Sequence, residues 1–176
     1  MREFLKIWAL AILAAVCYGL VHDQITVRVC PEYFTDYHPD IGLSGHVTLL
    51  ALAWGVIATW WMGAILGVPL ALVARLGPLP PFTARQLLTP LGVLLGVMGA
   101  AALMAGIAGY HATSGPLMVN IRGVQVPCLN TDPRFVADLW AHETAYFVGA
   151  WGALVLCAWM WAMRRKRGRG MAGVAE

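Results

Sequence analysis

Apolar residues fall into four long runs, and short segments rich in polar residues and proline separate them. Each run reaches or approaches the about 20 mostly apolar residues that an α-helix needs to cross a bilayer. The pattern therefore predicts four transmembrane helices, at about residues 4–22, 46–74, 87–110 and 135–163. We expect residues 1–169 to form one all-α membrane domain, a four-transmembrane-helix bundle with two polar outer loops.

The first apolar run also admits a second interpretation, because a signal peptide likewise begins with basic residues and continues as an apolar stretch. The basic residues here are Arg2 and Lys6, and the small residues Ala14 and Ala15 could mark a cleavage site. Cleavage would leave three helices and an outside N-terminus. The apolar run continues beyond these alanines almost to His22, and this length favours a retained helix.

The composition supports a location in the lipid bilayer. Hydrophobic residues make up 60% of the chain and charged residues 12%, which leaves too little polar surface to cover a soluble domain. Small residues recur four apart in the second and third runs, a spacing that lets helices approach closely. This spacing is more typical of packing within a bundle, and it is also compatible with a homo-oligomer. A membrane-protein partner fits the chain; a nucleic-acid partner is not expected.

The positions of lysine and arginine predict the orientation, since short loops rich in these residues stay cytoplasmic. Basic residues lie at the start of the chain, at Arg75 and Arg85 between the second and third helices, and from Arg164 onward. We therefore expect a multi-pass protein of the inner (plasma) membrane with both termini cytoplasmic. Residues 170–176 are expected to form a disordered cytoplasmic tail.

Side chains that can bind metals gather on the predicted outer side, which holds all five histidines and seven of the nine acidic residues. Helix ends are neighbours in a bundle, so histidines near them could converge on one site. Imidazole and carboxylate groups are common ligands of Zn, Fe, Mn and Cu. We expect a site for one such divalent transition metal, whose identity the sequence leaves open. The expected ligands are His22, His46, His111, Asp138 and His142.

The first outer segment, VHDQITVRVCPEYFTDYHPD, contains four of the nine acidic residues. It connects the first two helices, so it must arch over the outer mouth of the bundle, where Glu32 and His38 could fold down as a lid. Glu32 and Glu143 are the expected catalytic residues, one of them acting as a general base. The alternative is that these polar side chains only keep an outer loop solvated.

The four cysteines divide between helices and outer loops. Cys17 and Cys157 lie within apolar runs, where a thiol behaves as a small hydrophobic group. Cys30 and Cys128 lie one in each outer loop, and that compartment is oxidising in a Gram-negative bacterium. We expect a Cys30–Cys128 disulfide that ties the two loops together; the alternative is two free or metal-binding thiols.

Three runs, HDQITVRVCPEYFTDYHP, LALAWGVIATWWMGAILG and ADLWAHETAYFVG, resemble a family of small four-helix bacterial integral membrane proteins of uncharacterised function. The resemblance covers most of the chain, and the first, second and fourth helices especially. It implies no particular activity. It does imply that the His-Asp-Gln and Glu-Tyr-Phe runs are motifs of that family.

The sequence leaves three functions open, and whether the protein is an enzyme is open with them. The first is a metal-dependent membrane enzyme that acts on a lipid or on a small periplasmic molecule. The second is a non-catalytic accessory or scaffold subunit of a membrane complex. The third, less favoured, is a cytochrome with a single haem, held by His46 with His142 or by His22 with His111.

Overall fold

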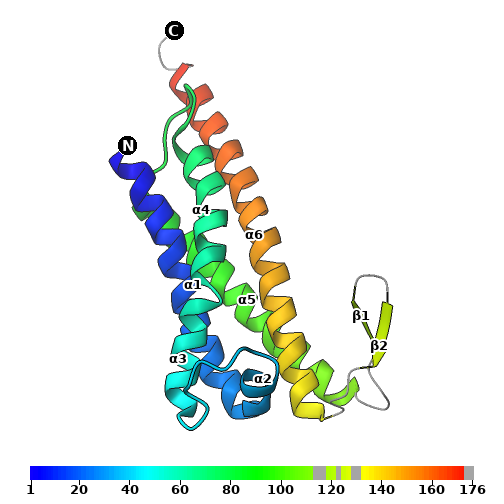
Figure 1. Ribbon diagram of the computed structural model, residues 1–176. Coiled ribbons are helices and arrows are strands. Elements are labelled where there is room, and N and C mark those ends of the chain that lie inside the picture. Colours follow the sequence, from blue (N-terminus) through cyan, green and yellow to red (C-terminus); the bar gives the residue numbers. More distant parts are fainter. Residues whose placement is uncertain (113–117, 122–123, 128–131, 173–176) are drawn as a thin grey trace.

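The computed structural model describes residues 1–112, 118–121, 124–127 and 132–172. Figure 1 shows long helices that run side by side, with both termini at one end of the molecule. We call this the terminal end and the opposite end the loop end. The elements in chain order are α1 (Arg2–Val29), α2 (Pro31–Asp36), α3 (Val47–Ile57), α4 (Trp60–Arg75), α5 (Ala84–Ala112), β1 (Met118–Ile121), β2 (Val124–Pro127) and α6 (Pro133–Ala172).

Within the described residues, four helical segments are long and apolar enough to cross a membrane, which confirms the predicted all-α membrane bundle. They are α1, α3 together with α4, α5, and α6 to Gly170. Helix α1 packs against α3 and α4, and α5 packs along α6. The strands β1 and β2 form a small antiparallel hairpin between α5 and α6, with Met118 opposite Pro127. The sequence pattern predicted only a polar loop there.

Two helices extend further than the apolar runs predict. Helix α1 continues past His22 to Val29, because residues 22–29 contain no glycine or proline and the next proline, Pro31, begins α2 at its first position. Helix α6 continues through the basic run to Ala172, so it includes residues 170–172 of the expected tail. Residues 173–176 lie outside the described residues.

The second membrane span is interrupted between α3 and α4, where it crosses α1. A Cβ atom added to Gly19 would lie 2.4 Å from the carbonyl oxygen of Gly55 and 2.5 Å from Cγ2 of Thr59. The two helix backbones therefore touch directly at this point. The hydroxyl of Thr59 donates a hydrogen bond of 2.5 Å to the Gly55 carbonyl, which is compatible with the local break in the helix.

Arg164 links α6 to the end of α4 at the terminal end. Its side chain is buried and donates hydrogen bonds to the carbonyl groups of Val73, Leu76, Leu79 and Pro80. The last carbonyl groups of a helix have no partner within the helix, and a basic side chain can supply one. Arg164 therefore closes α4 and fixes the turn that follows it.

A separate hydrophobic cluster forms at the loop end, where α2 contacts α1, α3 and α6. Tyr33 and Phe34 of α2 pack there with Val27, Trp54 and Phe135. The Nδ1 atom of His38 donates a hydrogen bond of 2.9 Å to the carbonyl oxygen of Tyr33. As its position between the first two helices predicted, the segment after α1 folds back over the bundle, where Tyr33 stacks on His142 of α6.

Candidate metal centre

Two histidines and one aspartate come together inside the bundle near the loop end. His22 and Asp23 lie on α1 and His142 lies on α6. Each offers one ligand atom, and these three atoms all lie within 4.8 Å of one another. The group is about two helical turns below the end of α1 at Val29, or about 10 Å at the rise of an α-helix. It therefore lies inside the bundle rather than at the tip of α1.

The side chain of His142 is held in one orientation from both sides. Its Nδ1 atom lies 2.8 Å from the backbone oxygen of Asp138, one turn earlier in α6. A carbonyl oxygen can only accept, so Nδ1 carries a proton; Nε2 pairs with the Asp23 carboxylate when the ring is protonated and offers a lone pair when the ring is neutral. That Nε2 atom lies 3.5 Å from Oδ1 of Asp23. A histidine that donates one ring N–H to a carbonyl and presents the other nitrogen is the usual arrangement of a metal ligand.

Aromatic rings fix the positions of both histidines. The ring of His22 meets the ring of His142 edge-on, with 4.6 Å between the centroids, and it stacks on Tyr18 at 5.3 Å. Tyr33 of α2 stacks on the other side of His142 at 4.6 Å. Burial, and after it the nearby carboxyl groups, raise the pKa of the Tyr33 hydroxyl above its ordinary value. The ring therefore acts as an uncharged wall over the histidine.

Several polar atoms here are buried without a hydrogen-bond partner among the described residues. They are the hydroxyl of Tyr18, Nε2 of His22 and both carboxyl oxygens of Asp138, whose side chain is only 1% exposed. Buried polar groups are normally paired, because an unpaired one loses its hydration and gains nothing in return. In a metal site described without its ion, a ligand nitrogen lacks a partner because the ion is its partner. The unpartnered Nε2 of His22, beside a second histidine and a carboxylate, fits this description. The donor set therefore fits a divalent transition metal.

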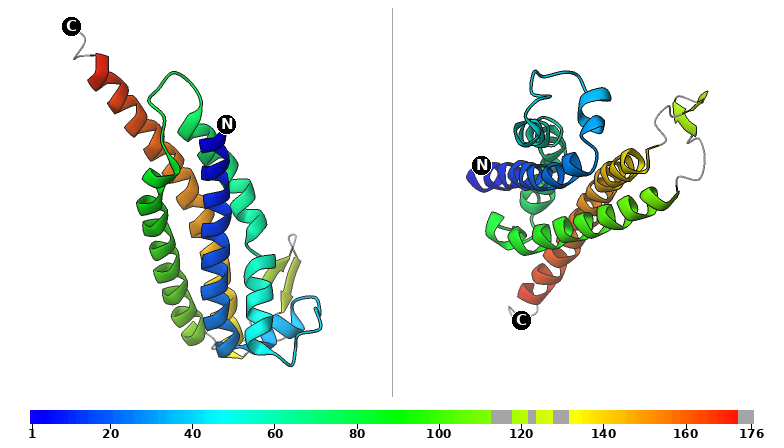
Figure 2. Two further views of the ribbon diagram at one scale, coloured as in Figure 1. Left: turned by 90° about the vertical axis from the view of Figure 1, so that its left-hand side faces the viewer. Right: turned by 90° about the horizontal axis from the view of Figure 1, so that it is seen from below.

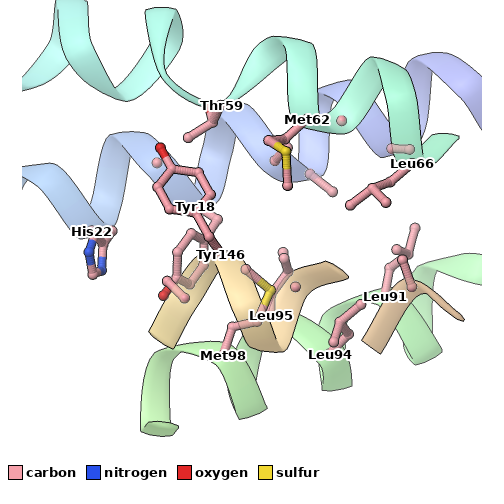
Figure 3. A pocket seen from close by; sticks show the side chains of 18 of the residues that line it. Tyr18, His22, Thr59, Met62, Leu66, Leu91, Leu94, Leu95, Met98 and Tyr146 are labelled. Atoms are coloured by element: carbon pink, nitrogen blue, oxygen red, sulfur yellow. The ribbon is translucent and has the colours of Figure 1, made fainter. Parts of the chain in front are cut away.

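A small pocket adjoins the three ligand atoms and runs between α1, α4, α5 and α6 (Figure 3). Tyr18, His22 and Tyr146 lie at its polar end, and Leu66 and Leu91 lie at its apolar end (Figure 3). Its volume is about 100 Å³, which is enough for about three water molecules at about 30 Å³ each. The pocket can therefore supply water to open coordination positions.

The structure brings together only part of the predicted ligand set. His22 and His142 belong to the group, whereas His46 at the N-cap of α3 and His111 near the end of α5 are exposed and do not. At least three of the four helix-end histidines were expected to meet, and two do. Asp138 is buried in the same region, but it contacts His142 through its backbone oxygen and is not a member of the group.

The predicted general bases also lie outside the group. Glu32 on α2 and Glu143 on α6 are both exposed. Glu32 accepts a hydrogen bond of 3.5 Å from the thiol of Cys30. Among the described residues, neither carboxyl group is part of the cluster that could hold an ion.

The arrangement favours an ion over a haem. Each expected axial pair, His46 with His142 and His22 with His111, joins a histidine inside the bundle to an exposed one. His22 and His142 instead face each other at a distance that leaves no room for a porphyrin ring between them.

Cys30 is a free thiol in this structure, so the predicted disulfide with Cys128 is not found. Cys128 lies outside the described residues. Burial raises the pKa of the Cys30 thiol to about 11, although a backbone hydrogen bond from Tyr33 opposes the shift and Glu32 adds to it. The group therefore stays protonated at neutral pH and packs within the loop-end cluster as a small apolar residue.

Sequence reasoning missed Asp23 and Tyr33 as site residues. Both lie in the segment that the sequence predicts to be an outer loop, because the apolar run stops near His22. A signal was present in the spacing, since Gly19, Asp23 and Thr26 recur at three- and four-residue intervals and form one buried face of α1. Continuing this helical period beyond the apolar run would have placed Asp23 inside the bundle.

Comparison with protein-family models, with curated proteins and with solved structures finds no match to this chain.

Proposed function

We propose that the protein is an integral membrane metalloprotein that holds one divalent transition-metal ion between His22, Asp23 and His142. The observation that carries this proposal is the convergence of the three ligand atoms within 4.8 Å, two helical turns inside the bundle. In tetrahedral coordination, bonds of about 2 Å place neighbouring ligand atoms roughly 3.4 Å apart. Side-chain movements of about 1 Å would therefore complete the site, as expected when metal binding repacks its ligands.

The donor set narrows the choice of metal and of chemistry. Two imidazoles and one carboxylate with open positions are used by zinc hydrolases and by non-haem Fe(II) oxygenases. We therefore propose Zn²⁺ or Fe²⁺ and a metal-dependent membrane enzyme. A divalent ion held here would polarise a water molecule or a polar substrate group in the adjoining pocket. The residues of the chain orient the site: the Asp138 carbonyl fixes the tautomer of His142, and Tyr33 excludes bulk water from one face of its ring.

Metal analysis of the purified protein tests this proposal directly. Purification without chelator is expected to yield about one Zn or Fe per chain, measured by inductively coupled plasma mass spectrometry. The double variant His22→Ala, His142→Ala is expected to contain neither. Metal-free wild-type protein that also fails to take up added Zn²⁺ or Fe²⁺ would instead support the non-catalytic accessory subunit.

We further propose that the terminal end faces the cytoplasm of a cell whose inner membrane holds the protein. The support is that Arg2, Lys6, Arg75, Arg85 and the basic run from Arg164 all belong to segments near that end. A reporter protein that is active only in the cytoplasm is expected to be active when it is fused after Glu176. One inserted near Asp36 is expected to report an external location, and the reverse pattern would invert the orientation of the metal centre.

A further inference from the structure

A second, larger pocket lies on the other side of His22, between α1, α5 and the first turns of α6. Its volume is about 440 Å³, within the range of about 300–1,000 Å³ that is usual for small-molecule sites. Figure 1 and the view from below in Figure 2 show that the loop-end part of α5 lies further to the side of α1 than its terminal-end part. This divergence makes room for the pocket.

The mouth of this pocket opens to the bilayer. Val21 and Ile25 of α1 and Leu103 and Ile107 of α5 line it, and each of these side chains is exposed. An exposed apolar side chain in a membrane span faces lipid, so a ligand can enter sideways from the bilayer without crossing water. Such a ligand needs an apolar body to match these walls.

The pocket wall carries three buried polar groups without a partner among the described residues: the hydroxyl of Tyr18, Nε2 of His22 and the carboxyl group of Asp138. Asp138 lines the pocket, its side chain is 1% exposed, and neither of its carboxyl oxygens has a hydrogen-bond partner among the described residues. Leaving a carboxyl group unpaired at this depth is unfavourable, and a ligand that donates a hydrogen bond would remove that penalty. A hydroxyl group is the least costly donor to bring in, because an ammonium group would have to lose much more hydration.

We propose that this pocket binds a membrane alcohol, an uncharged amphiphile whose hydroxyl group donates a hydrogen bond to the Asp138 carboxyl group and whose chain lies between α1 and α5. The proposal goes beyond the metal centre and does not require it, since Asp138 is not one of the three clustered ligands. His22 lines this pocket as well as the smaller one. A bound alcohol would therefore lie next to the metal centre.

Photolabelling of the full-length protein in lipid nanodiscs tests the proposal. The probe is a fatty alcohol with a diazirine in its chain, and the competitors are dodecanol, dodecyl methyl ether and dodecylamine. Labelled peptides are expected to come from α1 around Ile25 and from α5 around Leu103. Dodecanol is expected to compete about tenfold better than the ether, which cannot donate a hydrogen bond.

Variants separate this site from the metal centre. Asp138→Leu is expected to abolish the preference for dodecanol over the ether, whereas Asp138→Asn keeps a carbonyl acceptor and is expected to retain it. His142→Ala, at a position that does not line the pocket, is expected to lose metal but keep the preference. Equal competition by alcohol and ether in the wild type, an unchanged preference in Asp138→Leu, or stronger competition by dodecylamine would each overturn the proposal. Loss of the preference in a folded His142→Ala variant would overturn the independence of the two sites.

Discussion

Replacing His142 by alanine is expected to lower the affinity of the protein for Zn²⁺ by at least about a hundredfold. Loss of an outer-shell partner alone commonly lowers metal affinity by about 10–100-fold, and His142 is proposed as a direct ligand. Its Nε2 atom faces Asp23, and its orientation is fixed by the Asp138 carbonyl and by the ring of Tyr33. Competition with a fluorescent zinc chelator measures the affinity.

The neighbouring residue supplies the control for this variant. Glu143 lies on the same turn of α6 but is exposed, so Glu143→Ala is expected to leave the zinc affinity within a factor of about two. Both substitutions remove a titratable side chain from α6 at adjacent positions. His142 is buried in the bundle, whereas Glu143 is on the exposed face of the helix. Equal losses in both variants would mean that zinc binds at the surface of the helix rather than inside the bundle.

Replacing Gly19 by alanine is expected to destabilise the protein by about 3 kcal/mol, the upper part of the range for overpacking a core. The new Cβ atom would lie 2.4 Å from a backbone oxygen of α3, which cannot move unless the two helices separate. Separation would also shift Asp23, one turn further along α1, so zinc affinity is expected to fall as well. For a chain of this size the thermal unfolding midpoint is expected to drop by about 10 °C.

Gly96 provides the matched control for this substitution. It lies in α5, and a Cβ atom added there meets nothing within 4 Å. Alanine favours a helix over glycine by about 1 kcal/mol, so Gly96→Ala is expected to keep or slightly raise the midpoint. A drop of similar size in both variants would show that loss of glycine, and not contact between α1 and α3, causes the effect.

The membrane bundle could be predicted from the sequence because a helix that crosses lipid must be apolar over a fixed length. A span needs about 20 apolar residues whatever its neighbours are, so four runs give four helices. The same criterion misplaced the end of α1. The end of an apolar run shows where a span leaves lipid. A helix can continue beyond that point until a residue such as proline ends it, and here α1 continues to Val29, shortly before Pro31.

The composition of the centre was less predictable, because it depends on how far each helix reaches and on how the helices rotate. Ending α1 at His22 put that residue at the surface and turned Asp23 into a loop residue. With α1 extended to Val29, both residues lie two turns inside, and His46 and His111 remain near helix ends. The i to i+4 pair of Asp138 and His142 was recognised, but the contact between them uses a backbone oxygen, which sequence spacing does not reveal.

The position of Arg164 has a consequence for biosynthesis. The ribosome makes α6 after α1 and α4, and this helix carries both the cap on the end of α4 and the partner of Asp23. Until α6 is in place, Asp23 lacks its contact with His142 and the carbonyl groups after α4 lack the Arg164 donor. Translation that stops before Pro133 therefore yields three inserted helices with two exposed polar defects at opposite ends. Insertion of α6 removes both defects, because it brings His142 to Asp23 and Arg164 to the end of α4.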